Sequence, residues 1–438
     1  MVKIILKAIG TVLYGITLFR EKAFCRAGGK FTINQSIILY RKFTSPYIFT
    51  GYKLLPAGHV LITDEKGVIE DLVPIKDAGD GIEYLEGMLS PGFINAHCHL
   101  ELSHLKGRIP ENTGLVEFVF KIITERHFPE AEIVSAIKIA EVEMLQNGIV
   151  AVGDICNTVH TITQKTKQLL RYHNFIEVAG FVPAGAQTRF NAALEICHQF
   201  NAAAQPPTTN HQPQTSIVPH APYSVSPELF QLINTHPGNN LLTIHNQETI
   251  AEELFFKERS GDFLQLYEKL NIDISFFKAS GKSSLQSWWP NFNKGQSIIL
   301  VHDVTTTKED IECIQQPTTN HQPPTYFCLC PNANLYITNQ LPDVNMLMRE
   351  QCNIVLGTDS LASNHQLSIL EEMKTLQSHF PEIQTTSLLQ WATLNGAKAL
   401  QMDDIVGSFE KGKKPGIVLI DAIQNTQFTA SSSSKKIL

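Results

Sequence analysis

Residues 88–99 read MLSPGFINAHCH, an apolar strand-like run that ends in two histidines two positions apart. Similar runs recur seven more times along the chain, and stretches with helical periodicity separate them. These runs are GIVAVGDI (148–155), FIEVAGFVPA (175–184), TSIVPHAPYS (215–224), LLTIHNQE (241–248), SIILVHDV (297–304), TYFCLCPN (325–332) and NIVLGTDS (353–360). Eight strands that alternate with helices predict an α/β fold of the (β/α)8 barrel type over residues 91–400.

Both flanks of this barrel are expected to be β structure. Residues 36–90 hold short apolar runs bounded by Gly, Asp and Pro, and strand-like texture returns after residue 400. We therefore expect residues 36–90 and 401–438 to form one small β-sandwich domain with a flexible Ser/Lys-rich tail that frays. Residues 1–35 are expected to be an N-terminal extension. We interpret this segment first as dispensable sequence or the result of a start codon assigned too early. The alternatives are an amphipathic surface helix and an export signal.

Composition excludes several classes of protein. The 438 residues are 43% hydrophobic, which suits a large packed core and excludes a disulfide miniprotein, a collagen or a wholly disordered chain. A net charge of -7 without a Lys/Arg-rich run argues against binding to nucleic acid. The eight scattered cysteines include no CxxC pair, which favours reduced thiols and a cytoplasmic location. We expect no association with a membrane, because no stretch is long and apolar enough to span one.

The heptapeptide PTTNHQP occurs twice, at residues 207–213 and 317–323. Each copy lies in a polar, Pro-rich tract just upstream of a predicted strand, where a loop is expected. We interpret both as low-complexity insertions at the surface, so His211 and His321 are not expected to bind a metal.

Histidines and carboxylates gather at the ends of the predicted barrel strands. His97 and His99 share one face of the first strand, because residues two apart in a strand point the same way. The other residues at strand ends are His245 and Glu248 (fifth strand), His302 (sixth) and Asp359 (eighth). Barrels of this type place their active sites at these ends, and three imidazoles with one carboxylate suit Zn²⁺ or Fe²⁺. The alternative, that each histidine only caps its strand, explains single residues better than the whole set.

Six motifs at these positions resemble the amidohydrolase superfamily, specifically its cytosine/guanine deaminase and chlorohydrolase-like branch. They are PGFINAHCHLELSHLKG (91–107), PHAPYSVS (219–226), HNQE (245–248), VHD (301–303), CPNANL (330–335) and LGTDSLASN (356–364). The resemblance covers residues 45–422 and implies a metal-dependent hydrolase barrel. It implies one divalent metal, Zn²⁺ or alternatively Fe²⁺, bound by His97, His99, His245 and Asp359. The fourth strand lacks the lysine that the binuclear branch carboxylates, so one metal is expected.

The same resemblance implies roles for the remaining residues. Glu248 would be the catalytic proton shuttle, His302 and Asp359 would act on the hydrolytic water, and His220 would contact the substrate. HxHLE is similar to aminodeoxyfutalosine deaminases, and Glu101 is expected to contact a ribose or ring edge, or else to form a salt bridge or support a histidine. The family commonly has N-P-x-S-N where this chain has CPNAN (330–334), so Ala333 removes a hydroxyl whereas Asn334 is retained.

The expected function is hydrolytic deamination of an amino-substituted heterocycle or purine nucleoside. Aminodeoxyfutalosine or an adenosine thioether is the first expected substrate, followed by guanine or cytosine. One alternative is hydrolysis of a ring halide or cyclic amide, and another is a non-catalytic barrel. The resemblance is compatible with a homodimer. Four aromatic residues are expected either to stack on a base or to pack in the core, namely Phe118, Phe120, Trp288 and Trp289.

Overall fold

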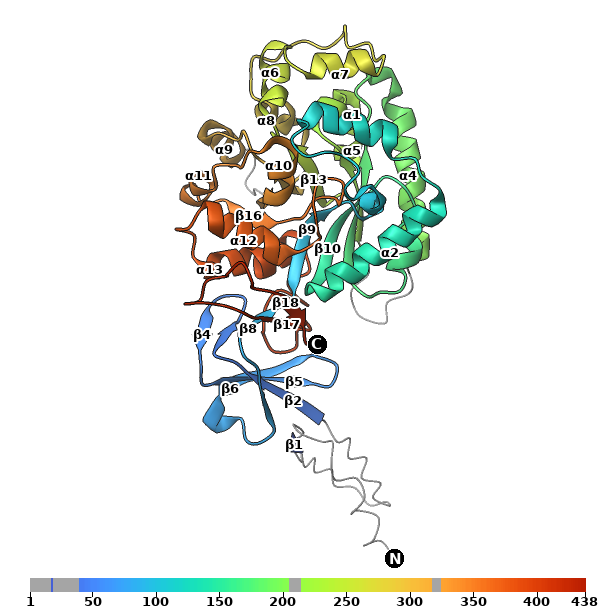
Figure 1. Ribbon diagram of the computed structural model, residues 1–438. Coiled ribbons are helices and arrows are strands. Elements are labelled where there is room, and N and C mark those ends of the chain that lie inside the picture. Colours follow the sequence, from blue (N-terminus) through green and yellow to red (C-terminus); the bar gives the residue numbers. More distant parts are fainter. Residues whose placement is uncertain (1–16, 19–38, 205–213, 317–323) are drawn as a thin grey trace, which may run out of the picture.

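The computed structural model describes residues 17–18, 39–204, 214–316 and 324–438 (Figure 1). It confirms the eight predicted barrel strands, which form two parallel four-stranded sheets in the orders β12-β11-β10-β9 and β13-β14-β15-β16. The strands are β9 (Phe93–Cys98), β10 (Ile149–Cys156), β11 (Arg171–Val178), β12 (Gln214–Pro219), β13 (Leu241–Asn246), β14 (Ser297–His302), β15 (Thr325–Leu329) and β16 (Asn353–Leu356).

Backbone hydrogen bonds at the carboxyl ends of the strands join the two sheets into a barrel. On one side, His97 O accepts from the amides of Thr358 and Asp359, both at 3.1 Å. On the other side, the amide of His245 donates to His220 O at 3.0 Å. Gly357 allows the first contact, because a Cβ at this position would come within 2.9 Å of His97 O. The residues that close the barrel are therefore the same ones that the sequence places in the site.

Helices surround the barrel as the alternating pattern predicts (Figure 1). In α2 (Glu130–Gln146), Ile133, Ile137, Ala140 and Met144 recur every three or four residues and form the buried face. The other helices below the cap are α3 (Ile162–Lys165), α4 (Ala186–Ala203), α5 (Pro227–Thr235), α8 (Ser284–Trp288), α9 (Lys308–Gln315), α10 (Pro331–Thr338), α11 (Val344–Arg349), α12 (Ile369–His379), α13 (Thr385–Gln390) and α14 (Gly396–Ala399).

A separate cap covers the carboxyl ends of the barrel strands. It contains α1 (Leu115–Glu125), α6 (Ile250–Glu258) and α7 (Phe263–Lys269), which lie at the end of the molecule opposite the small domain (Figure 1). The cap has its own apolar cluster, distinct from the barrel core, which includes Phe118, Phe255 and Tyr267. This second cluster holds the cap helices over the strand ends.

Two small sheets from both flanks pack against each other beside the barrel. One sheet contains β1 (Thr17–Leu18), β2 (Leu39–Thr44), β5 (His59–Asp64), β6 (Ile69–Pro74) and β7 (Ile82–Tyr84). The other contains β3 (Tyr47–Phe49), β4 (Leu54–Pro56), β8 (Met88–Pro91), β17 (Ile417–Ile420) and β18 (Ser434–Lys436). Phe43, Leu61, Leu89 and Ile417 share one apolar cluster between the sheets, as expected for a small sandwich.

The end of the chain does not fray as predicted. Ser434–Lys436 form β18, which pairs antiparallel with β17, and Asp421 accepts hydrogen bonds from both the amide and the hydroxyl of Ser433. Ile437 and Leu438 pack against the small apolar cluster, so these last two apolar residues fix a tail whose polar composition suggested flexibility.

The described residues contain no helix long and apolar enough to cross a membrane. The predicted extension (1–35), apart from Thr17–Leu18, and both PTTNHQP copies lie outside the described residues.

Candidate metal centre

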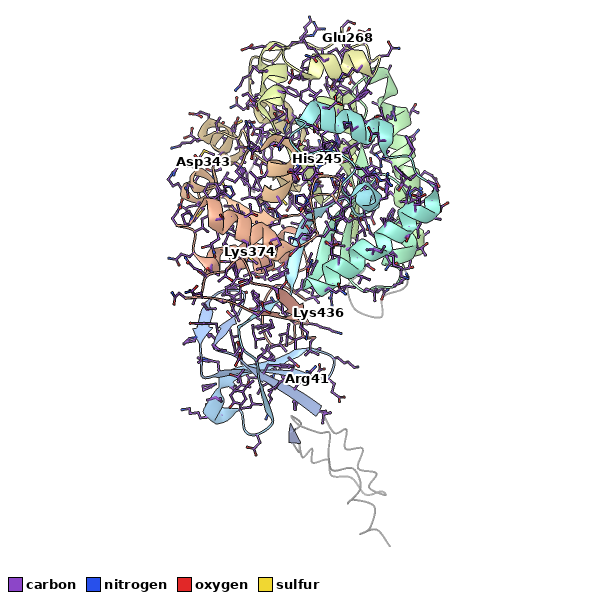
Figure 2. All side chains as sticks on the ribbon, viewed as in Figure 1. Arg41, His245, Glu268, Asp343, Lys374 and Lys436 are labelled. Carbon is purple, nitrogen blue, oxygen red and sulfur yellow. The ribbon has the colours of Figure 1, made fainter. Side chains whose placement is uncertain are left out.

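Four predicted ligands converge at the carboxyl ends of β9, β13 and β16. The Nε2 atom of His99 lies 3.1 Å from His97 Nε2 and 3.2 Å from His245 Nε2. Asp359 Oδ1 lies 3.3 Å from His99 Nε2 and 3.6 Å from His97 Nε2. Tetrahedral ligands 2.0–2.1 Å from a zinc ion would be about 3.3 Å apart, which matches this spacing. These buried nitrogen and oxygen donors therefore fit one divalent ion. Figure 2 shows His245 within the barrel, well away from Arg41 of the small domain.

Hydrogen bonds on the far side of the ligands orient them. His245 Nδ1 donates to His220 O at 2.8 Å, which directs Nε2 of the same ring toward the other ligands. Ser363 Oγ donates to Asp359 Oδ2 at 2.5 Å and leaves Oδ1 facing the histidines. Burial lowers the pKa of His99 well below its usual value and that of His245 to about 4, so both rings are neutral and able to bind a metal.

Burial alone would raise the pKa of Asp359. The nearby rings of His97, His99 and His302 outweigh that effect and hold the pKa of Asp359 below its usual range. Asp359 is therefore a carboxylate, as a metal ligand must be.

Glu248 and His302 face each other beside the ligand cluster, with Glu248 Oε1 3.6 Å from His302 Nε2. Burial raises the pKa of Glu248 well above its usual value, and the charges of Asp359 and Glu252 raise it further. Burial lowers the pKa of His302 to about 3. The buried site therefore favours the protonated form of Glu248 and the uncharged form of His302.

Several residues at this end of the barrel have left-handed backbone conformations. The φ angles are 48° for Gln247, 81° for His302 and 56° for Asp359. Such conformations are costly for residues other than glycine and are commonly found at functional sites. Glu252 supports the turn before the cap, because its carboxylate accepts from the amides of Gln247 (3.1 Å) and Glu248 (3.3 Å).

A cavity of about 750 Å³ extends from the ligand cluster toward the cap. Apolar side chains from α1, α7 and the loop after β11 form much of its wall, and Arg126 and Arg189 also line it. The polar residues at its base include His220, Glu248, His302 and Glu177. The predicted metal ligands and catalytic residues thus lie together at the base of a mostly apolar cavity.

Glu101 does not line this cavity, so the expected contact with a substrate is not what the structure shows. Its carboxylate is buried and accepts from Arg126 Nη2 at 2.7 Å, from both the amide and hydroxyl of Thr158 at 2.9 Å, and from the amide of Asn157 at 3.0 Å. The structure agrees with the alternative prediction, that Glu101 forms a salt bridge. Arg126, which Glu101 holds, is the residue that reaches the cavity.

Of the other residues predicted to contact the substrate or to stack on a base, some line the cavity and others pack in the core. His220 and Phe118 line the cavity, whereas Trp288 is buried in the barrel core and donates its indole N–H to Asn246 Oδ1 at 3.0 Å. Trp289 packs against the same core, and Lys269 covers the ring of Phe120.

The two residues of the altered CPNAN motif lie in α10. Ala333 is fully buried in the barrel core, so no polar group is needed at its position. Asn334 Nδ2 lies 3.1 Å from His302 Nδ1, so this retained residue orients the His302 ring.

Three charged residues of the cavity were not predicted from the sequence, namely Arg126, Glu177 and Arg189. Glu177 had a visible signal, because it is a charged residue inside the apolar run FIEVAGF. No feature of the sequence indicated the two arginines, because only the tertiary packing of their helices and loops brings them to the cavity.

Replacing Asp359 with alanine is expected to reduce the bound metal. The variant loses the anionic ligand and leaves three imidazoles. We expect less than one metal ion per chain by elemental analysis after gel filtration, whereas Asp71→Ala, at an exposed carboxylate of the small domain, retains the wild-type content. Full metal occupancy in Asp359→Ala would show that this carboxylate is not a ligand.

Comparison with known proteins agrees with this site. A family described as "Amidohydrolase family" matches residues 88–438. The chain is 26% identical over 386 residues to a 5-methylthioadenosine/S-adenosylhomocysteine deaminase of Pyrococcus abyssi, covering 84% of this chain and 82% of the relative. It is 26% identical over 385 residues to a 5'-deoxyadenosine deaminase of Methanosarcina acetivorans, covering 84% and 80%.

Solved structures share the fold. The aminofutalosine deaminase of Helicobacter pylori, in complex with methylthio-coformycin, has a TM-score of 0.74 at 20% identity and covers 89% of this chain and 93% of its own. The atrazine chlorohydrolase of Arthrobacter aurescens, complexed with zinc, has a TM-score of 0.66 at 16% identity and covers 86% of each chain. Since the family match spans the whole barrel, with the ligand cluster at its strand ends, this chain belongs to the amidohydrolase family.

Proposed function

We propose that this protein is a metal-dependent deaminase that releases ammonia from an adenosine-type nucleoside. One observation carries the proposal: a carboxylic acid with a raised pKa, Glu248, lies beside a cluster of three histidines and one carboxylate that fits a divalent metal. The deaminases among the relatives support the choice of an amino group as the leaving group.

The side chains have complementary tasks in this reaction. When bound, a divalent metal supplies the Lewis acidity that makes water nucleophilic near neutral pH. Glu248 donates its proton to a ring nitrogen of the base, which makes the amino-bearing carbon more electrophilic. Asp359 and His302 hold the attacking water, and Asp359 accepts one proton from it. The carbon gains a bond to this oxygen. Glu248, now ionised, takes the proton of the added hydroxyl and delivers it to the amino group, which leaves as ammonia when its bond to carbon breaks. The proton on Asp359 then returns to Glu248, which restores both groups.

Zinc is the metal we propose, with Fe²⁺ as the alternative. Three imidazole nitrogens and one carboxylate oxygen are a common zinc ligand set. An adenosine deaminase structure from Xanthomonas campestris, which shares the fold with a TM-score of 0.68, has bound zinc. One metal per chain is proposed, because β12 supplies no lysine for carboxylation.

The cavity suits a nucleoside with a long substituent on its ribose. Apolar side chains such as Leu115, Phe118 and Ile122 line the wall. Arg189 adds a positive charge, and Arg126 adds a guanidinium group that is ion-paired with Glu101. A 5'-substituent with an apolar stem and an anionic end would contact both kinds of group. Aminodeoxyfutalosine and S-adenosylhomocysteine have a carboxylate in this substituent, so we propose them ahead of methylthioadenosine and adenosine.

We also propose a cytoplasmic location, which the seven free cysteines among the described residues support. The homodimer stays a prediction.

Hydrolysis of a ring halide or cyclic amide is the second candidate, since the atrazine chlorohydrolase shares the fold. Release of ammonia separates the two, because a dehalogenation produces halide ions and no ammonia. A barrel without catalytic activity is the less favoured alternative, because it would not need a buried carboxylic acid beside a set of metal-binding side chains.

Glu248→Gln is expected to retain the metal and lose turnover. Glutamine keeps the shape of the side chain but cannot transfer a proton, which costs about 10²–10⁴-fold in kcat. The measurement is ammonia release together with metal content, and Glu258→Gln, an exposed residue of the same helix region, is the matched control. Wild-type turnover in Glu248→Gln would contradict the role as proton shuttle.

The proposed substrate order is tested by ammonia release from aminodeoxyfutalosine, S-adenosylhomocysteine, methylthioadenosine, adenosine, guanine and cytosine. We expect the two carboxylate-bearing nucleosides to have kcat/KM values about 10-fold or more above that of methylthioadenosine, because a charged hydrogen bond contributes about 1.5–3 kcal/mol. Equal values would contradict the proposed contact between the substituent and the arginines.

A further inference from the structure

We propose that Glu177 and His220 form a pair of hydrogen-bonding groups that recognises the two vicinal hydroxyl groups of the substrate ribose. This inference rests on the proposed nucleoside deaminase function and assigns Glu177 as a residue that determines specificity for the sugar.

Glu177 presents one unused carboxylate oxygen to the cavity. It lies on β11, is almost completely buried and lines the cavity. Its Oε2 accepts from Asn157 Nδ2 at 3.0 Å. Its Oε1 lies 3.6 Å from His245 Nδ1, but that N–H donates to His220 O at 2.8 Å. Among the described residues, no other group hydrogen-bonds to Glu177 Oε1.

One ring nitrogen of His220 already has a partner within the protein. Its Nδ1 lies 2.7 Å from Ser224 Oγ, which also lies 3.0 Å from Ala221 O. The other ring nitrogen, Nε2, can accept or donate a hydrogen bond according to which nitrogen carries the proton, and a hydroxyl group can be its partner in either case. His220 Nε2 has no hydrogen-bond partner in the part of the chain that the structure describes, and the residue lines the cavity.

The side chains of Glu177 and His220 belong to one compact group. A carboxylate oxygen of Glu177 and one ring nitrogen from each of His220 and His245 all lie within 4.8 Å of one another. A buried carboxylate oxygen without a donor is costly, so a ligand that donates one hydroxyl to Glu177 and places a second hydroxyl at His220 is favoured there. A vicinal diol supplies two O–H groups on one rigid ring, and the ribose of the proposed substrate has such a diol.

A second cation is the competing occupant of this group. His245 Nδ1 already donates to His220 O, so only Glu177 and His220 would be left as ligands. Two protein ligands are fewer than the three or four of typical zinc sites. The geometry therefore favours hydroxyl groups over a second metal.

The test compares adenosine with 2'-deoxyadenosine and 3'-deoxyadenosine. Dissociation constants are measured by calorimetry with metal-loaded protein in the Glu248→Gln background, where turnover is slow, with and without Glu177→Gln. Glu195→Gln, an exposed residue of α4, is the matched control. Metal content is measured for every variant.

In the protein that retains Glu177, we expect adenosine to bind about 10–100-fold more tightly than at least one deoxy analogue. A hydrogen bond to a charged group contributes a free energy that corresponds to this ratio. Glu177→Gln should weaken adenosine binding by a similar factor. It should leave the affinity for that analogue and the metal content unchanged. Equal binding of all three nucleosides would overturn the inference. A Glu177→Gln variant that weakens all three equally, or that loses a second metal ion, would overturn it too.

The proposed function is judged separately, by ammonia release from the wild-type protein. If ammonia is released but ribose and deoxyribose nucleosides bind equally, the diol inference fails while the deaminase proposal stands. If no nucleoside yields ammonia, the deaminase proposal fails, and the binding ratios still decide the role of Glu177.

Discussion

Closure of the barrel is the constraint on which the site depends. Two four-stranded sheets meet at two seams, and backbone hydrogen bonds to His97 O and His220 O close them. The same residues carry side chains that face the metal centre and the cavity. A shift at either seam would therefore move a metal ligand, which ties the fold and the proposed chemistry to the same contacts.

Burial of the site separates the protonation states of its acids and bases. Desolvation disfavours charge, so it lowers the pKa of His245 to about 4 and raises the pKa of Glu248 well above its usual value. Asp359 is the exception, because neighbouring imidazoles reverse the effect of burial on its pKa. The surroundings therefore favour the ionised form of Asp359, which can bind a metal, and the protonated form of Glu248.

The sequence allows the position of a residue to be predicted where that position follows from the order of strands and helices alone. His97, His245 and Asp359 were predictable, because the carboxyl ends of parallel barrel strands must meet at one end. Glu101 was ambiguous, because its backbone leaves the strand as a helical turn and directs the carboxylate toward Arg126. The ordered end of the chain was missed, because pairing of β18 with β17 depends on long-range contacts that the local Ser/Lys-rich composition does not indicate.

We propose that one metal centre and Glu248 together remove an amino group from a nucleoside. The most direct measurement is the amount of ammonia formed per nucleoside consumed, before and after a chelator strips the metal and after zinc is restored. We expect one ammonia per nucleoside, loss of activity when the metal is stripped, and recovery at one zinc ion per chain. Product formation without ammonia, or full activity in the stripped protein, would contradict it.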